Sequence, residues 1–287
     1  PIGRTNEVLT SCLFMRKDVK VSPHRVKLLI DRKYLDTDCN AARSVHSDQS
    51  KIALVCGFGL DYQGWPKASG AIINPKADMA MTPVEGATAA ATGWTSYTVE
   101  KKSEKARISA IFRTMREKGI LDKNNISDPT KGIFQSDTGE ITLHCKERRL
   151  EVKTPRTEGA TINPGKQVKL GTLAILACDE PATVALCSVD GKDLVDSRRM
   201  LLIFSTFAVN TDMELSDNML VLRKLGKYPV LMKTASLKLQ LKKVQGTYKL
   251  YALGFDGSRR EELPVAKSAN GLDISINTAE LKNGPTT

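Results

Sequence analysis

Residues 182–210 read ATVALCSVDGKDLVDSRRMLLIFSTFAVN, and this stretch decides the fold. Two apolar runs, residues 183–189 and 200–204, lie on either side of the dipeptide Asp190-Gly191. Asp-Gly between two such runs favours a hairpin with a type I′ turn, because both central residues of that turn need positive φ. The second run is apolar without alternation, which is typical of a strand covered on both faces. We therefore expect a β-hairpin whose second strand is central to its sheet.

Strands alone are predicted for the second half of the chain, residues 128–287. Candidate strands cover residues 140–145, 150–154, 168–178, 183–189, 194–209, 229–241, 247–255, 259–265 and 272–277. Residues 236–242 (SLKLQLK) alternate strictly, so one face of that strand should be buried and the other wet. Many strands with short polar turns predict an all-β sandwich. A split into two small sub-domains near residues 225–229 remains open.

Helices and strands both occur in the first half, residues 1–127. The candidates are a helix over residues 5–15, strands over 25–30 and 50–56, and a helix over 100–118. In the last of these, Ile108, Ile111, Phe112 and Met115 form a single apolar stripe, and Gly119 supplies a stop. This order of helices and strands predicts a small, incomplete α/β segment. The fold class is therefore α+β overall, with a boundary near residues 126–129.

The net charge of +11 raises the question of a nucleic-acid partner. Residues 101–150 carry twelve Lys and Arg against seven Asp and Glu, and residues 201–250 carry eight against three. The excess is thus spread over two separate stretches, and aromatic residues make up only 5% of the chain. A single-strand platform needs interleaved aromatics. A solvated basic surface is favoured over a nucleic-acid site, although a polyanionic glycan could use the same surface.

Metal, cofactor and membrane sites find little support in the sequence. The six cysteines form no C-x-x-C pair, and His24, His46 and His144 lie apart from one another. The chain contains no P-loop, no dinucleotide fingerprint and no G-x-S-x-G elbow, so we expect no cofactor. No apolar run approaches the ~18 to 20 residues of a spanning helix. Both ends look cut, so we expect a piece of a larger protein, and localisation stays open between secreted and cytoplasmic.

Several stretches resemble a known family when they are taken together. They are SDTGEI (136–141), LEVKTPRTEG (150–159), VDGKDLVDSRR (189–199) and GTYKLYALGFDG (246–257), with IGRTNEV (2–8) and DVKVSPHRV (18–26) upstream. They resemble the C-terminal β-rich region of large bacterial glycoside-hydrolase-like proteins, in which a catalytic (β/α)8 barrel comes first. The resemblance implies that residues 1–127 are the trailing edge of that barrel and residues 128–287 an accessory region. Most of the barrel is absent, so glycosidase activity would belong to the parent protein.

The resemblance and the residue types suggest a few candidate sites. Asn6-Glu7 resembles the Asn-Glu pair that supplies the acid/base in many barrel glycosidases, where a second carboxylate lies ~5 to 9.5 Å away. Here Glu7 begins an amphipathic helix, which favours a solvated carboxylate. Trp65 and Trp94 are possible stacking platforms for a sugar ring, and Tyr62 could extend the one at Trp65. Packing in a core is the alternative for both tryptophans.

Two further candidates lie in the second half. In the loop TPRTE (154–158), Arg156 and Glu158 could together hydrogen-bond vicinal sugar hydroxyls, although a structural turn is the plainer interpretation. Arg198 and Arg199 are adjacent on an expected strand and would point to opposite faces, so they cannot form one clamp. A carboxylate partner such as Asp193 or Asp196 is the simpler role for them.

The sequence therefore leads to two functional hypotheses. The first is a fragment of a carbohydrate-active enzyme, in which the sandwich supports the catalytic barrel of the parent protein and binds oligo- or polysaccharide. The second is a structural or protein-interaction module with a basic docking surface and no activity of its own. Whether the chain is itself an enzyme stays open, because no complete catalytic pair is visible.

Overall fold

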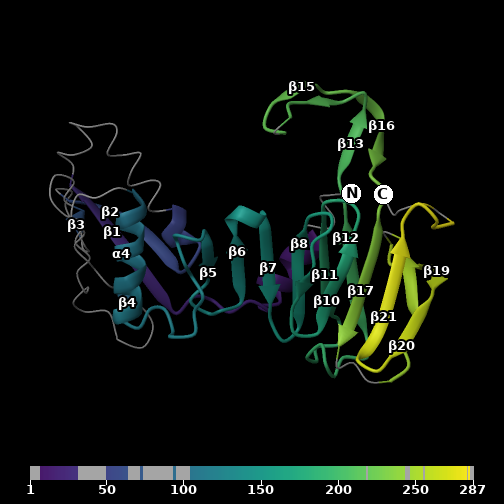
Figure 1. The fold of residues 1–287 in the computed structure, drawn as a ribbon, viewed down its shortest axis with the longest axis horizontal. Helices are drawn as coiled ribbons and strands as arrows, with labels where there is room; N and C mark the ends of the chain where they lie inside the picture. Colours follow the sequence, from purple (N-terminus) through teal and green to yellow (C-terminus); the bar gives the residue numbers. More distant parts are fainter. Residues whose placement is uncertain are drawn as a thin grey trace. The chain divides into compact units, whose positions relative to one another are not determined.

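The structure is a computed structural model, and its strands and helices are drawn in Figure 1. The described residues are 7–31, 50–63, 72–73, 93–94, 104–217, 219–242, 246–254, 256–282 and 284. They form mainly β-strands, in several sheets, with a small helical part. The mixed first half and strand-rich second half that the sequence predicts are therefore present.

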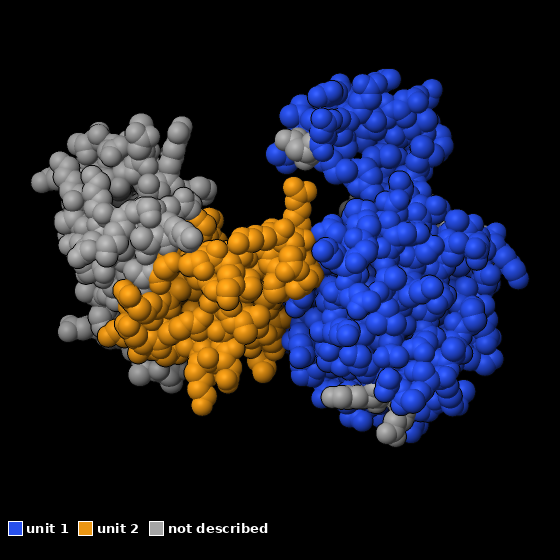
Figure 2. Space-filling model, viewed as in Figure 1, with its two compact units in different colours: residues 1–19, 151–287 blue, residues 20–150 orange. Residues whose placement is uncertain are grey.

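The chain divides into two compact units, which Figure 2 shows in different colours. Residues 20–150 make up one unit, and residues 1–19 together with 151–287 make up the other. We call them the N-unit and the β-unit. The division at 150/151 lies downstream of the 127/128 boundary expected from the sequence, and the first 19 residues belong to the β-unit.

The N-unit contains a parallel sheet. Its strands are β1 (His24–Asp31), β2 (Gly57–Gln63), β3 (Ile72–Ile73) and β4 (Gly93–Trp94), and β1 pairs in parallel with each of the others. The strand predicted over residues 50–56 is wrong, because residues 50–53 are helical and the strand begins at Gly57. Ile52, Val55 and Cys56 are buried at helical spacing. So short an apolar run fits either period, which explains the error.

The helix predicted over residues 100–118 is confirmed as α4 (Glu104–Glu117). All four residues of its predicted stripe are buried, and Gly119 ends it with φ +72°. Phe112 packs edge-on against Phe134 of β5 (Ile133–Gln135), with ring centroids 5.7 Å apart. Strand β5 pairs in antiparallel fashion with β6 (Ile141–His144), which leads into a short 3-10 helix, η2 (Cys145–Glu147).

The hairpin of residues 182–210 is confirmed in the β-unit, but two details differ from the prediction. Strands β7 (Arg149–Lys153), β8 (Thr157–Ile162), β11 (Ala182–Ser188) and β12 (Met200–Ser205) follow one another in an antiparallel sheet. β12 ends this sheet and is half-buried, whereas β11 is the buried inner strand, so the central position predicted for residues 200–204 is wrong. Residues 189–199 form a long loop rather than a type I′ turn, since Gly191 has positive φ and Asp190 does not.

A second antiparallel sheet completes the β-unit. Its order is β20 (Val265–Ser268), β21 (Gly271–Asn277), β17 (Ser236–Lys242), β10 (Leu173–Cys178) and β9 (Val168–Lys169). The alternation predicted for residues 236–242 is confirmed, because every second residue of β17 is a buried leucine. One apolar cluster takes members from both sheets, among them Leu186 of β11 and Leu239 of β17. A hairpin of β18 (Leu250–Leu253) and β19 (Arg259–Leu263) packs against it through Leu250.

Residues 206–233 form a two-stranded arm on the β-unit. Its outer strands are β13 (Ala208–Thr211) and β16 (Lys227–Met232), and its tip contains β14 (Glu214–Leu215) and β15 (Leu222–Lys224). The possible split near residues 225–229 falls inside this arm. Residues before and after the arm contribute to the same buried cluster, so they share one core.

Candidate functional site

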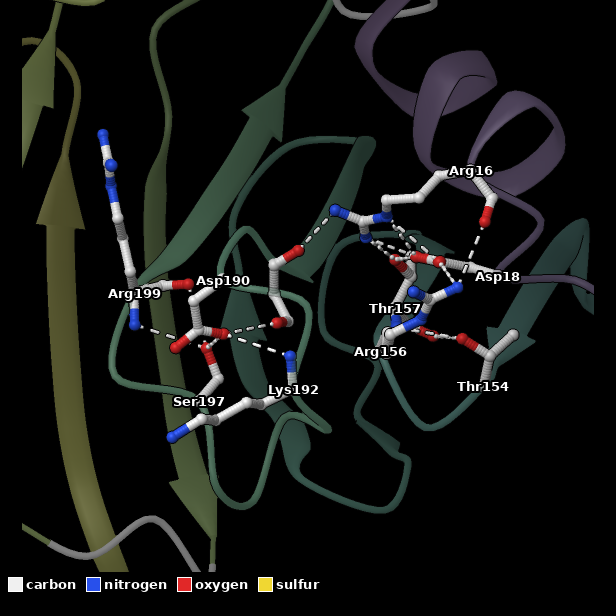
Figure 3. Close-up of polar contacts among 10 residues, drawn as sticks. Arg16, Asp18, Thr154, Arg156, Thr157, Asp190, Lys192, Ser197 and Arg199 are labelled. Carbon is white, nitrogen blue, oxygen red and sulfur yellow. Dashed lines mark hydrogen bonds and ion pairs between the residues drawn. The ribbon is translucent and has the colours of Figure 1, made fainter.

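The densest polar cluster among the described residues surrounds Asp18 of the β-unit (Figure 3). The Asp18 side chain is 0% exposed, while those of Arg16 and Arg156 are 28% and 30% exposed. Asp18 Oδ1 accepts from Arg16 Nε at 3.0 Å and lies 2.7 Å from Arg156 Nη2. Asp18 Oδ2 accepts from Arg16 Nη2 and from Thr157 Oγ1, the latter at 2.7 Å. Both carboxylate oxygens are therefore fully engaged.

Local structure brings these side chains together. Residues 7–10 are helical and continue into a π-helical turn, η1 (Ser11–Met15), so Arg16 and Asp18 directly follow a helical segment. The loop before β8 closes on itself, because Thr157 N donates to Thr154 Oγ1 and Thr154 N donates to Thr157 O, each at 2.9 Å. This turn presents Arg156 to the segment, and Arg156 Nη2 also donates to Arg16 O at 3.1 Å.

The electrostatics of the cluster favour ions on both sides. Burial acts to raise the pKa of Asp18, but hydrogen bonds from Arg16 and Thr157, together with the charges of Arg16 and Arg156, outweigh it and hold the pKa below its usual value. The hydrogen bond to Asp18 likewise raises the pKa of Arg16. A carboxylate that is ionised and saturated with donors suits structural anchoring rather than proton transfer.

Glu158 is buried and points to backbone amides rather than to a surface where a sugar could bind. The residue is only 4% exposed, and its carboxylate accepts from three backbone amides, Gly171 N at 3.0 Å, Thr172 N at 2.8 Å and Leu173 N at 2.7 Å. A Cβ at Gly171 would lie 2.4 Å from Glu158 Oε1, so this approach requires glycine. The predicted joint contact of Arg156 and Glu158 with a sugar therefore lacks geometric support, since both side chains are already bound within the protein.

Asp190 organises the loop of residues 189–199 (Figure 3). Its carboxylate accepts from Ser188 Oγ and Ser197 Oγ, both at 2.9 Å, and from Arg198 N at 2.8 Å. These bonds, with that from Arg198 N the strongest, hold the pKa of Asp190 far below its usual range. Arg198 and Arg199 lie in this loop, not on a strand as predicted, and the carboxylate that their segment meets is Asp190 through the backbone of Arg198.

The predicted aromatic platform is described only in part. Trp65 lies outside the described residues. Trp94 is paired through β4 with Arg25, and Tyr62 through β2 with Ile30, so the two aromatic positions lie at different ends of β1. At a rise of ~3.3 Å per residue they are roughly 16 Å apart along the strand direction. The backbone positions of Tyr62 and Trp94 therefore do not by themselves bring the two residues to the same sugar ring.

Glu7, the candidate acid/base, is an exposed residue of the helical stretch 7–10. An exposed position is compatible with the solvated carboxylate that the sequence favours. The carboxylates of Asp18 and Glu158 are both buried and both taken up by hydrogen bonds within the protein. The described residues therefore do not assemble the pair of opposed carboxylates that glycoside hydrolysis uses.

A second polar cluster lies in the N-unit at the start of β1. Asp137 Oδ2 accepts from Ser22 Oγ at 2.6 Å and is 3.0 Å from His24 Nδ1. Ser22 Oγ also accepts from Gly57 N at 3.2 Å. The carboxylate thus stands between the serine and the histidine, whereas a nucleophilic triad needs the histidine in the middle. This cluster fastens β1 to β2 and to the SDTGEI segment.

A shallow hollow of about 660 Å³ lies between α4 and residues 125–133 of the N-unit. Arg116 does not point to a free ligand there, because it donates to Asn125 O at 2.8 Å and Ser127 O at 2.6 Å. Arg113 and Lys131 on its rim are paired with Glu117 and Asp128. Across the described ranges, no group of three or more His, Cys, Asp or Glu side chains could hold a metal ion.

The other chemical features of the described residues are plain. No helix among them is both long and apolar enough to cross a membrane. Their five cysteines are free thiols, and burial raises the pKa of Cys187 to about 12. Comparison with known proteins adds no assignment, since no family model, no curated protein and no solved structure matches the chain.

Sequence reasoning missed the residues at the centre of the two polar clusters of the β-unit, Asp18 and Asp190. A signal existed for Asp190, because Asp-Gly followed by Ser197 suits an Asx-type loop as well as a hairpin turn. For Asp18 the sequence offers only the spacing Arg16-x-Asp18. Its partners Arg156 and Thr157 are far away in the chain, so no local pattern could have revealed the cluster.

Proposed function

We propose that this chain is the supporting, accessory part of a carbohydrate-active, glycoside-hydrolase-like protein. The motif resemblance of residues 136–257 supports the class. The closed character of the polar clusters supports the role, because their carboxylates hold backbone and arginine groups rather than an open surface. Catalysis is left to the barrel of the parent protein in this proposal.

We further propose that the two sheets of the β-unit form a β-sandwich. Its support is the single apolar cluster that draws on both sheets, which is how the inner faces of a sandwich pack. The Glu158 carboxylate of β8 adds a polar tie, since it holds the backbone amides at the start of β10. A sandwich held in this way is a rigid base for a neighbouring segment.

The Asp18 cluster is the observation that carries the supporting role. Arg16 Nη1 donates to Ser188 O at 2.5 Å, and Arg156 Nη2 donates to Arg16 O at 3.1 Å. Residues 7–19 are thereby attached at their C-terminal end to β11 and to the loop before β8. A segment that is continuous with these helical residues is thereby held at one fixed point on the β-unit.

Arg156→Ala tests the attachment, with Arg198→Ala as the matched control. Both changes remove an arginine from a loop of the β-unit, but only Arg156 bonds to Asp18 and Arg16. Amide exchange of residues 8–16 should rise at least about tenfold in Arg156→Ala, since a charge-assisted hydrogen bond is worth about 1.5–3 kcal/mol. Arg198→Ala should leave this exchange unchanged. Equal exchange in the two variants would remove the basis for a supporting role.

The carbohydrate class needs its own measurement, a glycan array read at low and high salt. Binding that persists at high salt and drops in Trp94→Ala would support stacking on a sugar. Binding that fades with salt and ignores Trp94→Ala would favour the alternative, a module with a basic docking surface. Loss of glycan binding in Arg156→Ala without faster exchange of residues 8–16 would instead restore Arg156 as a ligand. Absence of binding altogether would leave the supporting role without a glycan-holding function.

A further inference from the structure

The arm of residues 206–233 exposes many large apolar side chains. Eight of the sixteen large apolar residues that are exposed in the described part lie on it. They are Phe207, Met219, Leu220, Val221, Leu222, Leu225, Tyr228 and Leu231. Leu220 is 82% exposed and Tyr228 is 87% exposed. Large exposed apolar surface on one element of a soluble protein commonly marks an interaction site.

This surface belongs to a built element rather than to a loose loop. Ser216 and Val221 close the tip, with Ser216 N donating to Val221 O and Val221 N donating to Ser216 Oγ, each at 2.9 Å. Asn210 Nδ2 donates to Leu225 O at 3.0 Å and ties the bend between the two strand pairs. Gly226, at that bend, has φ +74°, and a Cβ there would lie 2.4 Å from Thr211 O. The sequence thus specifies the shape of the arm.

An isolated two-stranded ribbon is marginally stable in water. Figure 1 shows β13 and β16 leaving the strands of the β-unit, with β15 at the far end. At its base the arm is joined by Lys233 N donating to Phe207 O at 2.8 Å. Beyond the base, the ribbon forms two internal ion pairs and several internal hydrogen bonds, while large apolar side chains are exposed. Such an element is stabilised when another surface covers it.

The charges of the arm indicate which kind of surface fits. The arm carries three acidic residues (Asp212, Glu214, Asp217) and four basic ones (Arg223, Lys224, Lys227, Lys233), and Lys233 at its base is paired with Glu180 at 3.1 Å. Two of these pairs are internal, Lys224–Glu214 at 3.4 Å and Lys227–Asp212 at 3.1 Å. In a chain with net charge +11, the arm has a formal charge of only +1, so two copies can meet here with little charge repulsion. A polyanion would find little net attraction.

The area and the strand edges complete the argument. Summed over the whole ribbon, side chains of this size at these exposures present on the order of 1,000 Å² of apolar surface, and a stable interface takes about 800 Å² from each partner. Lys224, Lys227 and Pro229 lie on β15 and β16, and such residues oppose open-ended addition of strands. Val209 and Leu231 pair across β13 and β16, and Leu231 is exposed, so the ribbon offers an apolar side chain there instead. We propose that two copies of this chain associate through the apolar faces of their arms, as a two-fold symmetric dimer.

Sedimentation equilibrium of the full 287-residue chain tests the dimer. The double variant Leu220→Asp/Tyr228→Asp changes two highly exposed residues, so it should fold as the wild type does. Val21→Asp is the control, because Val21 is also 82% exposed but lies outside the arm. We expect a dimer for the wild type and Val21→Asp, and a dissociation constant raised at least about 100-fold in the double variant.

Three results would overturn the proposal. The first is a wild-type chain that stays monomeric at all concentrations reached. This includes the case in which another part of a longer protein covers the arm and protects its amides from exchange. The second is a dimer that the double variant leaves intact while circular dichroism shows both proteins folded. The third is open-ended assembly, which a closed two-fold interface does not allow.

Discussion

Replacing Asp18 by Asn is the most informative single change in this chain. Asn keeps the shape of the side chain but removes the charge and turns one acceptor oxygen into a donor. The donors that face Asp18 are the guanidinium groups of Arg16 and Arg156 and the hydroxyl of Thr157. After the change, an amide NH2 would oppose an N–H or O–H donor, and two guanidinium groups would lose their counter-ion.

The expected loss follows from burial. Removing one partner of a buried ion pair costs about 3–5 kcal/mol, because it leaves an uncompensated charge. Asp18 is 0% exposed, but the two arginine side chains are 28% and 30% exposed and can turn partly toward water. We therefore place the loss at the lower end, about 3 kcal/mol in the free energy of unfolding of the β-unit.

The loss should depend on pH with a definite sign. The folded protein holds the pKa of Asp18 below its unfolded value of about 3.9. The ionised carboxylate thus contributes stability that is fully present above about pH 4 and is lost as the pH falls through the folded pKa. The difference between wild type and Asp18→Asn should be constant from pH 7 to about pH 5 and should shrink below about pH 4. Asp190, whose pKa is also lowered, titrates in both proteins and cancels.

Amide exchange of β8 and β11 measures this free energy within the β-unit alone. Asp193→Asn is a suitable control, because Asp193 is exposed on the neighbouring loop. The control should lose no more than about 0.5 kcal/mol, as is usual for surface substitutions. The reasoning is refuted if Asp18→Asn is no more harmful than Asp193→Asn, or if its deficit persists unchanged well below pH 3.

The remaining predictions concern three other places in the β-unit and one in the N-unit. Glu158→Gln should lower the free energy of unfolding of the β-unit by about 3 kcal/mol in the same exchange experiment, because charge-assisted bonds to three amides are weakened. Gly226→Ala should destabilise more than Gly165→Ala in thermal unfolding, since both have positive φ (+74° and +72°) but only Gly226 meets backbone within 3 Å. In alkylation at pH 8 followed by mass spectrometry, exposed Cys145 should react in the folded protein, whereas Cys187, with its pKa raised by burial to about 12, should react only after unfolding.

Local periodicity predicts which elements this fold contains better than it predicts which elements pack beside one another. The stripe of α4 and the alternation of β17 are both confirmed, because each is a pattern that a single element needs to bury one face. The run of residues 200–204 failed for a different reason. β12 has side chains of cluster members such as Leu202 on one face and is only half-buried throughout, although every residue of the run is apolar. An apolar run can be buried, but whether it is buried depends on which strands and sheets pack against it.

The polar clusters were out of reach for the same physical reason. Asp18 and Thr157 are separated by 139 positions in the chain, yet they bond at 2.7 Å in a buried environment. Sequence reasoning judged Arg156 and Glu158 as neighbours on one loop and assigned them a shared ligand. In the structure one carboxylate partner comes from the N-terminal segment, and Glu158 turns to the amides before β10. Arg156 lies in the turn before β8 whereas Glu158 lies in the strand itself, so the two side chains point to different partners although only Thr157 separates them.

Closed clusters and an open arm lead to one physical conclusion about this chain. The buried carboxylates of Asp18 and Glu158 are matched by donors within the protein, so these two places consume their binding capacity internally. The arm does the reverse, since two of its ion pairs form within the ribbon while Leu220 and Tyr228 face water. Surface that remains uncovered and apolar, rather than the polar clusters, is therefore where interaction with another molecule lowers the free energy most.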